Sequence, residues 1–165
     1  MTNCKSLYKT HEKQFNDKIL YPMNSLSSLF YLIPMMFISD LVGKFILFGM
    51  AVSSTLWWAK QTKTSHYFDL LFLSSTLIWS LSYITKINSL NYFIVPIMFI
   101  RNKNNDYKNI IIVSSVSLLL LSNANYISKS IFVFSIVSKI SDTFCGNQYG
   151  TAIFHILSSI SICFI

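Results

Sequence analysis

Residues 43–60 read GKFILFGMAVSSTLWWAK, an apolar run whose only charged side chains, Lys44 and Lys60, lie near its ends. Crossing a hydrocarbon core of about 30 Å takes roughly 20 helical residues, so this run approaches the length of a membrane-spanning helix. Runs of similar character recur along the chain, and the fourth and fifth are clearly short: residues 23–41, 43–60, 66–86, 87–101, 107–123, 126–143 and 148–165. The pattern predicts an all-α integral membrane bundle of seven short transmembrane helices.

The composition favours a membrane protein over a soluble domain. Apolar residues make up 53% of the 165 residues and charged residues only 12%, against about 25% charged residues in soluble domains. We expect two parts, a polar, lysine-bearing N-terminal segment at residues 1–19 and a seven-span transmembrane domain at residues 20–165. The first apolar run lacks a cleavage site of small residues, so we expect it to be retained.

The positive charges lie in the N-terminal segment and in the gaps between apolar runs, not along one helix face. The net charge of +7 therefore does not indicate a nucleic-acid partner. If the runs alternate across a membrane, ten of the 13 Lys and Arg residues lie on one side, including Lys139 within the sixth run, and only Lys44, Lys86 and Lys129 lie on the other. The positive-inside rule then predicts a cytoplasmic N-terminus. The short spans favour a thin membrane such as that of the endoplasmic reticulum.

Pairs of serine recur inside the apolar runs. Small hydroxyl residues let membrane helices approach closely and form hydrogen bonds with each other, so we interpret most of these pairs as helix-packing positions. The pairs are Ser27-Ser28, Ser53-Ser54, Ser74-Ser75, Ser114-Ser115 and Ser158-Ser159.

Two ionisable residues inside apolar runs, Asp69 and His155, are the strongest pointers to a site. An Asp at the centre of a membrane helix costs roughly 2.5 to 3.5 kcal/mol, so such a residue needs a partner. Alternation places the starts of the third and seventh spans beside the end of the second, which carries Ser54. The sequence therefore predicts a polar cluster at one membrane face. The partner of Asp69 is either a hydroxyl or indole group or a metal site, and His155 fits an interhelical hydrogen bond as well as a metal remnant.

Three windows together resemble a known family. Gly49–Trp58 ends the second span with Ser54 one turn before Trp58, and Asp69 follows eleven residues after Trp58. Gly150–Ser158 opens the seventh span with Thr151 four residues before His155. Asn24 and Ser27 open the first span as Asn-x-x-Ser. In order and offset, these windows are similar to the motifs of the alkaline ceramidases and, more distantly, of the superfamily that includes the progestin and adipoQ receptors.

The resemblance implies a zinc amidohydrolase fold in which zinc lies among three histidines, with a serine and an aspartate close by. In this chain, Trp58 and Thr151 stand at two of the three histidine positions. An indole N–H has no lone pair to offer a metal, and a neutral hydroxyl is a poor substitute for imidazole. The matching residues are Ser54, Asp69 and His155, which the resemblance implies as catalytic and metal-binding residues. His66, one turn before Asp69, is a further candidate ligand.

Three hypotheses about function follow. The first is a divergent ceramidase-like protein with an impaired zinc site, weak or absent zinc binding, and a lipid-binding role toward membrane lipids or a ceramide-like sphingolipid. The second is an active zinc-dependent hydrolase of lipid amides that uses Ser54, Asp69 and His155. The third, from another class, is a small transporter, channel or membrane-remodelling protein. If the side chains of Ser54, Asp69 and His155 converge in space, the first two hypotheses are favoured over a chance match of the sequence windows.

Overall fold

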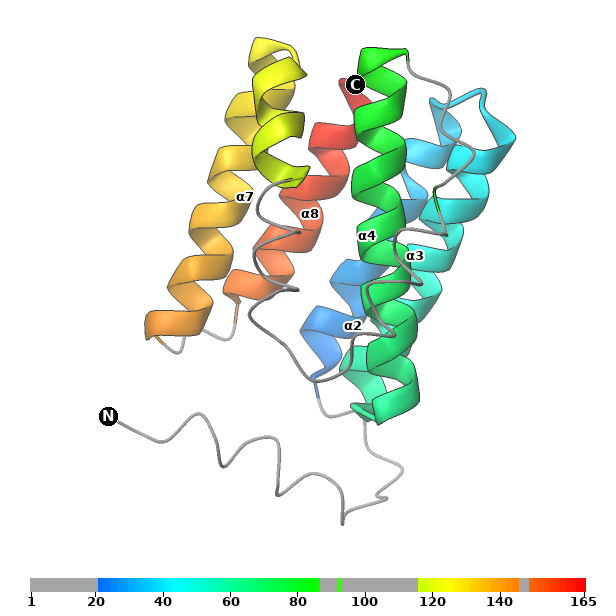
Figure 1. Cartoon of the computed structure of the whole chain (residues 1–165). Helices are drawn as coiled ribbons and strands as arrows, with labels where there is room; N and C mark the ends of the chain where they lie inside the picture. Colours follow the sequence, from blue (N-terminus) through cyan, green and yellow to red (C-terminus); the bar gives the residue numbers. More distant parts are fainter. Residues whose placement is uncertain (1–20, 87–91, 93–115, 146–148) are drawn as a thin grey trace.

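The computed structural model describes residues 21–86, 92, 116–145 and 149–165, and every regular element in these ranges is helical. This confirms the all-α class for the described part of the chain. Figure 1 shows the helices lying side by side as a bundle. The elements, in chain order, are α2 (Pro22–Ser28), the 3₁₀ turns η2 (Leu29–Leu32) and η3 (Pro34–Met36), α3 (Leu41–Lys60), α4 (Lys63–Thr85), a helical stretch at 116–123, α7 (Tyr126–Cys145) and α8 (Gly150–Cys163).

Four of the predicted segments coincide with single helices, namely α3, α4, α7 and α8. The first predicted segment is helical but broken into α2, η2 and η3. Pro34 has no backbone N–H and its ring crowds the preceding turn, so a continuous α-helix cannot run through this position. The predicted segment 87–101 lies outside the described residues, as does the first half of the segment 107–123.

Two helices in the described part of the chain are long and apolar enough to cross a membrane, Leu41–Lys60 and Thr64–Thr85. A third apolar helix, Gly150–Cys163, is shorter, with 14 residues. The count of seven spans and the direction of insertion remain predictions.

Sequence signals explain where α3 and α4 begin and end. The Asp40 side chain caps α3 by accepting hydrogen bonds from the amides of Val42 (3.2 Å) and Gly43 (3.0 Å). Gln61 ends α3 in the left-handed region, at φ 47°. Thr62 then starts α4 through a capping box with Ser65, so the two helices form a tight hairpin.

Asp40 also joins the far ends of the same two helices, because its carboxylate accepts a hydrogen bond of 2.7 Å from the indole of Trp79 on α4. Partial burial opposes ionisation of this carboxyl group. The hydrogen bonds from Trp79, Gly43 and Val42 outweigh that effect and hold the pKa of Asp40 below its usual value.

The helices are arranged as two pairs joined by the first segment. In Figure 1, α3 lies beside α4 and α7 beside α8, and α2 contacts both α3 and α8. The main core lies where these elements meet, around Tyr31, Ile46, Leu47, Met50 and Trp79. α2 therefore places its own side chains between the two pairs, which is where the candidate site is built.

The described serine pairs are buried inside the bundle, as helix-packing positions require. Ser27, Ser28, Ser53, Ser54, Ser74, Ser75, Ser158 and Ser159 are all buried, whereas Ser114 and Ser115 lie outside the described residues. A similar contact joins α7 to α8, where Ser128 and Ser161 each donate a hydrogen bond to the other's backbone carbonyl, at 3.1 and 3.0 Å. Small hydroxyl residues thus hold neighbouring helices close together.

Candidate functional site

His155 on α8 lies at the centre of a buried polar site, with only 3% of its surface exposed. Its ring nitrogen Nδ1 is 2.9 Å from the hydroxyl of Ser27 and 3.3 Å from that of Ser28, both on α2. Both serines also donate to the backbone carbonyl of Asn24, at 3.0 and 2.8 Å. The last turn of α2 therefore supplies the hydrogen bonds that hold the imidazole ring in place.

Ser28 continues the site from α8 to α3 and α4. Its hydroxyl donates to Ser54 Oγ on α3 at 3.1 Å. The Ser54 side chain in turn lies close enough to the carboxyl group of Asp69 on α4 to interact with it. The structure thus brings Ser54, Asp69 and His155 together, linked through Ser28, from three different helices. Their catalytic or metal-binding roles remain predictions.

Two acceptor atoms beside these residues are buried without a hydrogen-bond partner in the described part of the chain, Asp69 Oδ1 and Asn24 Oδ1. A buried acceptor left unpaired costs about 1 to 3 kcal/mol, and more when it is charged. Most buried polar groups in proteins are paired. The two oxygens therefore offer places where a donor group of a ligand or a water molecule would be stabilised.

The two positions at which the resemblance implies histidine both face Lys139 of α7. The Lys139 ammonium donates to Thr151 Oγ1 at 2.6 Å and lies 5.2 Å from the centre of the Trp58 ring. Lys139 also pairs with Asp142 at 3.5 Å, and Thr151 donates a hydrogen bond to the same carboxylate. The ammonium is within electrostatic range of Asp69 and His155.

We use the term polar cluster for the side chains that these contacts join across the bundle. Its members are Asn24, Ser27, Ser28, Ser54, Trp58, Asp69, Lys139, Asp142, Thr151 and His155.

Sequence reasoning identified most of these residues but missed Ser28, Asp142 and the part that Lys139 plays. In the sequence, Lys139 is only one of the charges that predict the topology. Yet Lys139 and Asp142 are ionisable residues within or at the end of the apolar run 126–143, and ionisable residues in such runs mark functional sites or paired charges. The same rule that selected Asp69 and His155 would have found this pair.

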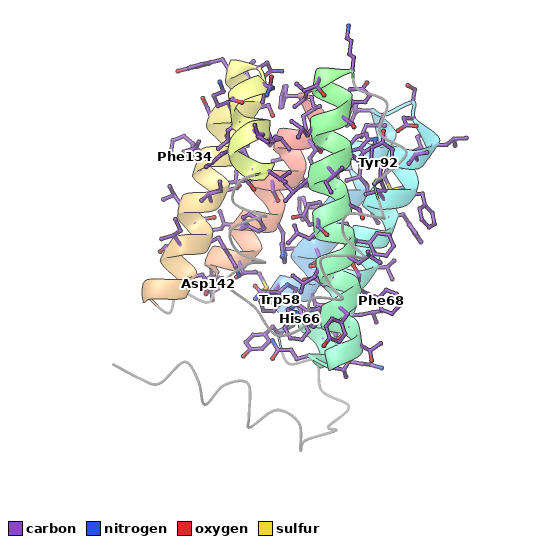
Figure 2. All side chains as sticks on the ribbon, in the orientation of Figure 1. Trp58, His66, Phe68, Tyr92, Phe134 and Asp142 are labelled. Atoms are coloured by element: carbon purple, nitrogen blue, oxygen red, sulfur yellow. The ribbon has the colours of Figure 1, made fainter. Side chains whose placement is uncertain are left out.

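His66 lies against Trp57, with ring centres 4.4 Å apart. In Figure 2, His66, Trp58 and Asp142 lie toward the same end of the bundle, the lower end in that view. No group of three His, Cys, Asp or Glu side chains in the described ranges is placed to hold a metal ion. The polar cluster contributes one imidazole and two carboxylates, with an ammonium among them. This donor set does not match the three-histidine zinc site that the resemblance implies, because Trp58 and Thr151 stand at two of the histidine positions.

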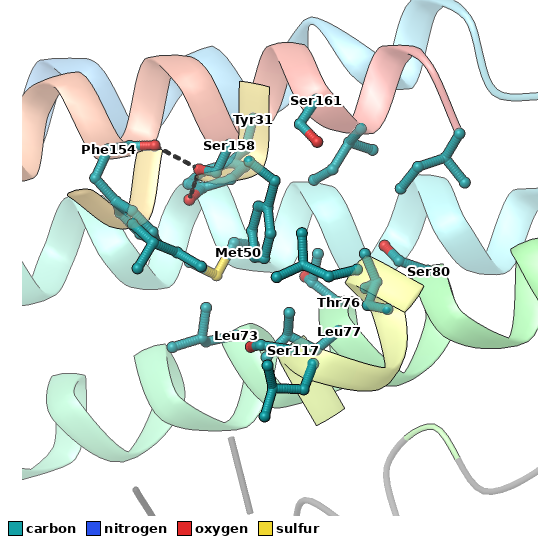
Figure 3. A pocket seen from close by; sticks show the side chains of 17 residues that line it. Tyr31, Met50, Leu73, Thr76, Leu77, Ser80, Ser117, Phe154, Ser158 and Ser161 are labelled. Carbon is teal, nitrogen blue, oxygen red and sulfur yellow. Dashed lines mark hydrogen bonds between the residues drawn. The ribbon is translucent and has the colours of Figure 1, made fainter. Parts of the chain in front are cut away.

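An apolar cavity of about 400 Å³ adjoins the polar cluster. It is lined mainly by aliphatic and aromatic side chains from α3, α4, the helical stretch 116–123, α7 and α8, including Met50, Leu73, Leu77 and Phe154 (Figure 3). Its polar edge is formed by Tyr31, whose hydroxyl is 2.8 Å from Ser158 Oγ. The Tyr31 ring centre is 5.9 Å from that of His155, so the cavity begins next to the imidazole.

No protein-family model, curated protein or solved structure matches this chain. The interpretation of the site therefore depends on its own geometry and on the sequence windows that converge there.

Proposed function

We propose that this chain is a divergent ceramidase-like, multi-pass membrane protein that binds a lipid carrying a polar amide or hydroxyl headgroup, with its zinc amidohydrolase site impaired. The observation that carries the proposal is an apolar cavity whose lining residue Tyr31 lies beside His155 of the polar cluster, inside one helical bundle. Membrane lipids have this division between a hydrogen-bonding head and an apolar chain. A ceramide-like sphingolipid fits best.

The outer surface of the bundle supports a location in lipid. Large apolar side chains along one face of α3 are exposed, among them Phe45 (59%), Phe48 (52%) and Leu56 (45%). The opposite face, with Ile46, Leu47 and Met50, is buried. An apolar outer face of this kind is costly in water but is solvated by lipid chains.

The cavity has the size and lining of a ligand site. Its volume of about 400 Å³ falls within the range of roughly 300 to 1,000 Å³ typical of such sites, and few polar groups line it. A chain placed there would bring its headgroup toward Tyr31 and the neighbouring His155, in the polar cluster that also holds the unpaired oxygens of Asn24 and Asp69. Those oxygens accept hydrogen bonds, so an amide N–H or hydroxyl donor is the complementary group.

The replacements at two ligand positions support impairment. Trp58 and Thr151 cannot replace imidazole as zinc ligands, and the His155 nitrogen Nδ1 is engaged by serine hydroxyls. Without a metal to polarise the amide carbonyl and activate water, hydrolysis loses its nucleophile. The cavity and the hydrogen-bonding groups beside it are kept, and these suit the binding of a lipid.

The test is ceramide binding by the full-length protein purified in detergent, measured with a fluorescent long-chain ceramide. Ser117 lines the cavity, and Ser117→Phe would fill part of it, so we expect binding to weaken by about tenfold or more. Ser122→Phe is the matched control, because Ser122 lies on the same helical stretch and is exposed. It should bind like the native protein.

Equal binding by the native protein and Ser117→Phe would contradict the cavity assignment. Zinc-dependent ceramide hydrolysis by the native protein, together with about one zinc per chain, would contradict the impaired-site assignment and favour the active hydrolase. Ion flux through reconstituted vesicles without any ceramide binding would favour a transporter or channel.

A further inference from the structure

Lys139 is held in the polar cluster by side chains from three helices. Its own helix, α7, supplies Asp142, α8 supplies Thr151, and α3 supplies the face of the Trp58 ring. A lysine that merely extended from a membrane helix toward water would place its ammonium away from the bundle. Here the side chain is 39% exposed, but its ammonium is engaged by Thr151, Asp142 and the Trp58 ring of the same bundle.

The charges of the cluster explain why a cation is needed there. Asp142 carries its carboxyl group to within 3.5 Å of the Lys139 ammonium, with only 22% of its side chain exposed. A carboxylate largely taken out of water is destabilising unless an opposite charge and hydrogen bonds compensate. Lys139 supplies that charge, and Thr151 donates a hydrogen bond to the same carboxylate.

We propose that Lys139 is the built-in cation of the polar cluster, paired with Asp142 and occupying, between Trp58 and Thr151, the space that a bound metal would need. The reference to a metal position rests on the proposed function, whereas the charge pairing with Asp142 rests on geometry alone. An ammonium offers three donors and no acceptor, so it cannot act as a ligand itself. It also disfavours a second cation nearby, so the site binds its ligand without metal.

The first experiment tests the charge pairing by thermal unfolding of the full-length protein in detergent. Lys139→Met keeps the length of the side chain but leaves Asp142 without its cation, so we expect the Tm to fall by about 5 °C or more. Adding Asp142→Asn removes the unpaired charge, keeps an acceptor for Thr151, and should restore most of that loss. Lys129→Met, on the same helix but outside the polar cluster, is the control and should change Tm little.

An unchanged Tm for Lys139→Met, or losses that simply add in the double variant, would overturn the pairing. Neither outcome depends on lipid binding, so failure of this inference and failure of the proposed function can be told apart.

The second experiment measures zinc content to test whether Lys139 occupies the space that a metal would need. Trp58→His with Thr151→His, beside His155, would supply three imidazoles, two of them four residues apart on one face of α8. With Lys139 retained, its ammonium should oppose the metal. Adding Lys139→Met should raise zinc affinity by about tenfold or more, giving close to one zinc per chain by elemental analysis. Equal zinc affinity with and without Lys139 would overturn the proposal.

Discussion

Asp40 shows how much of this fold can depend on one side chain. Its carboxylate caps α3 through two backbone amides and accepts the Trp79 indole N–H from α4. The same residue therefore starts one helix and fastens the next one to it. Because Trp79 is only 1% exposed, loss of Asp40 would leave a buried indole N–H without its acceptor.

We expect Asp40→Ala to lower the free energy of unfolding by about 1 to 3 kcal/mol, since it removes both the cap and the acceptor for Trp79. Asp40→Asn keeps a side-chain oxygen and should cost less. Denaturant unfolding in detergent measures both. A larger loss for Asp40→Asn than for Asp40→Ala would contradict this account of the residue.

The pKa of Asp40 also predicts a pH dependence. Because the folded-state pKa lies below the unfolded value of about 3.9, the ionised carboxyl stabilises the fold above that value, and the stabilisation is lost as pH falls through the folded pKa. The stability difference between the native protein and Asp40→Asn should therefore shrink on acidification below about pH 4. A difference that stays constant down to pH 3 would show that charge plays no part.

At the scale of elements, close helix contacts depend on two glycines of α3 that face α4. A Cβ added at Gly43 would lie 2.4 Å from the Trp79 ring, and one added at Gly49 would lie 2.0 Å from the Phe72 ring. Both approaches are too short for a real side chain. The two sites differ in the freedom of the neighbouring ring, because Trp79 is buried and hydrogen-bonded to Asp40, whereas Phe72 is only partly buried.

We expect Gly43→Ala to destabilise the fold by about 1 to 3 kcal/mol through overpacking against a ring that cannot move away. Gly49→Ala should cost less, because Phe72 can turn toward the outside of the bundle. Thermal unfolding of the two variants in the same detergent makes the comparison. Equal losses would indicate that backbone separation, and not ring freedom, sets the cost.

At the scale of the whole molecule, the lengths of α3 and α4 and the turn between them bear on how the bundle lies in a membrane. α3 and α4 are the two described helices that are long and apolar enough to span, and a hairpin of two residues between them turns the chain back. If both helices span the membrane, the two ends of α4 lie on opposite sides of it. The Lys and Arg distribution predicts that the α3–α4 turn is cytoplasmic.

Reporter fusions after Lys44, Lys63 and Lys86 should therefore report the far side, the cytoplasm and the far side again. A fusion at the C-terminus should report the far side, because seven spans separate it from the cytoplasmic N-terminus. The same location for the fusions after Lys44 and Lys63 would exclude α3 as a span and with it the seven-span arrangement.

The sequence by itself determined the helical class, the positions of α3, α4, α7 and α8, and the polar positions Ser54, Asp69 and His155. Helices of this kind can be predicted from local sequence, because apolar runs of fixed length and caps such as Asp40 and Thr62 depend on residues close together in the chain. The break at Pro34 is also a local signal in the sequence, although the apolar run 23–41 predicts a single span across it.

Only the tertiary structure decided what completes the site. Ser28 reaches His155 because α2 packs between α3 and α8, and Lys139 turns inward because Thr151, Trp58 and Asp142 come together from separate helices. In the sequence, a lysine in an apolar run looks the same whether its ammonium faces lipid headgroups or the side chains of other helices. Its direction here is set partly by Thr151 and Trp58, which lie on other helices, and these contacts exist only once the helices have packed.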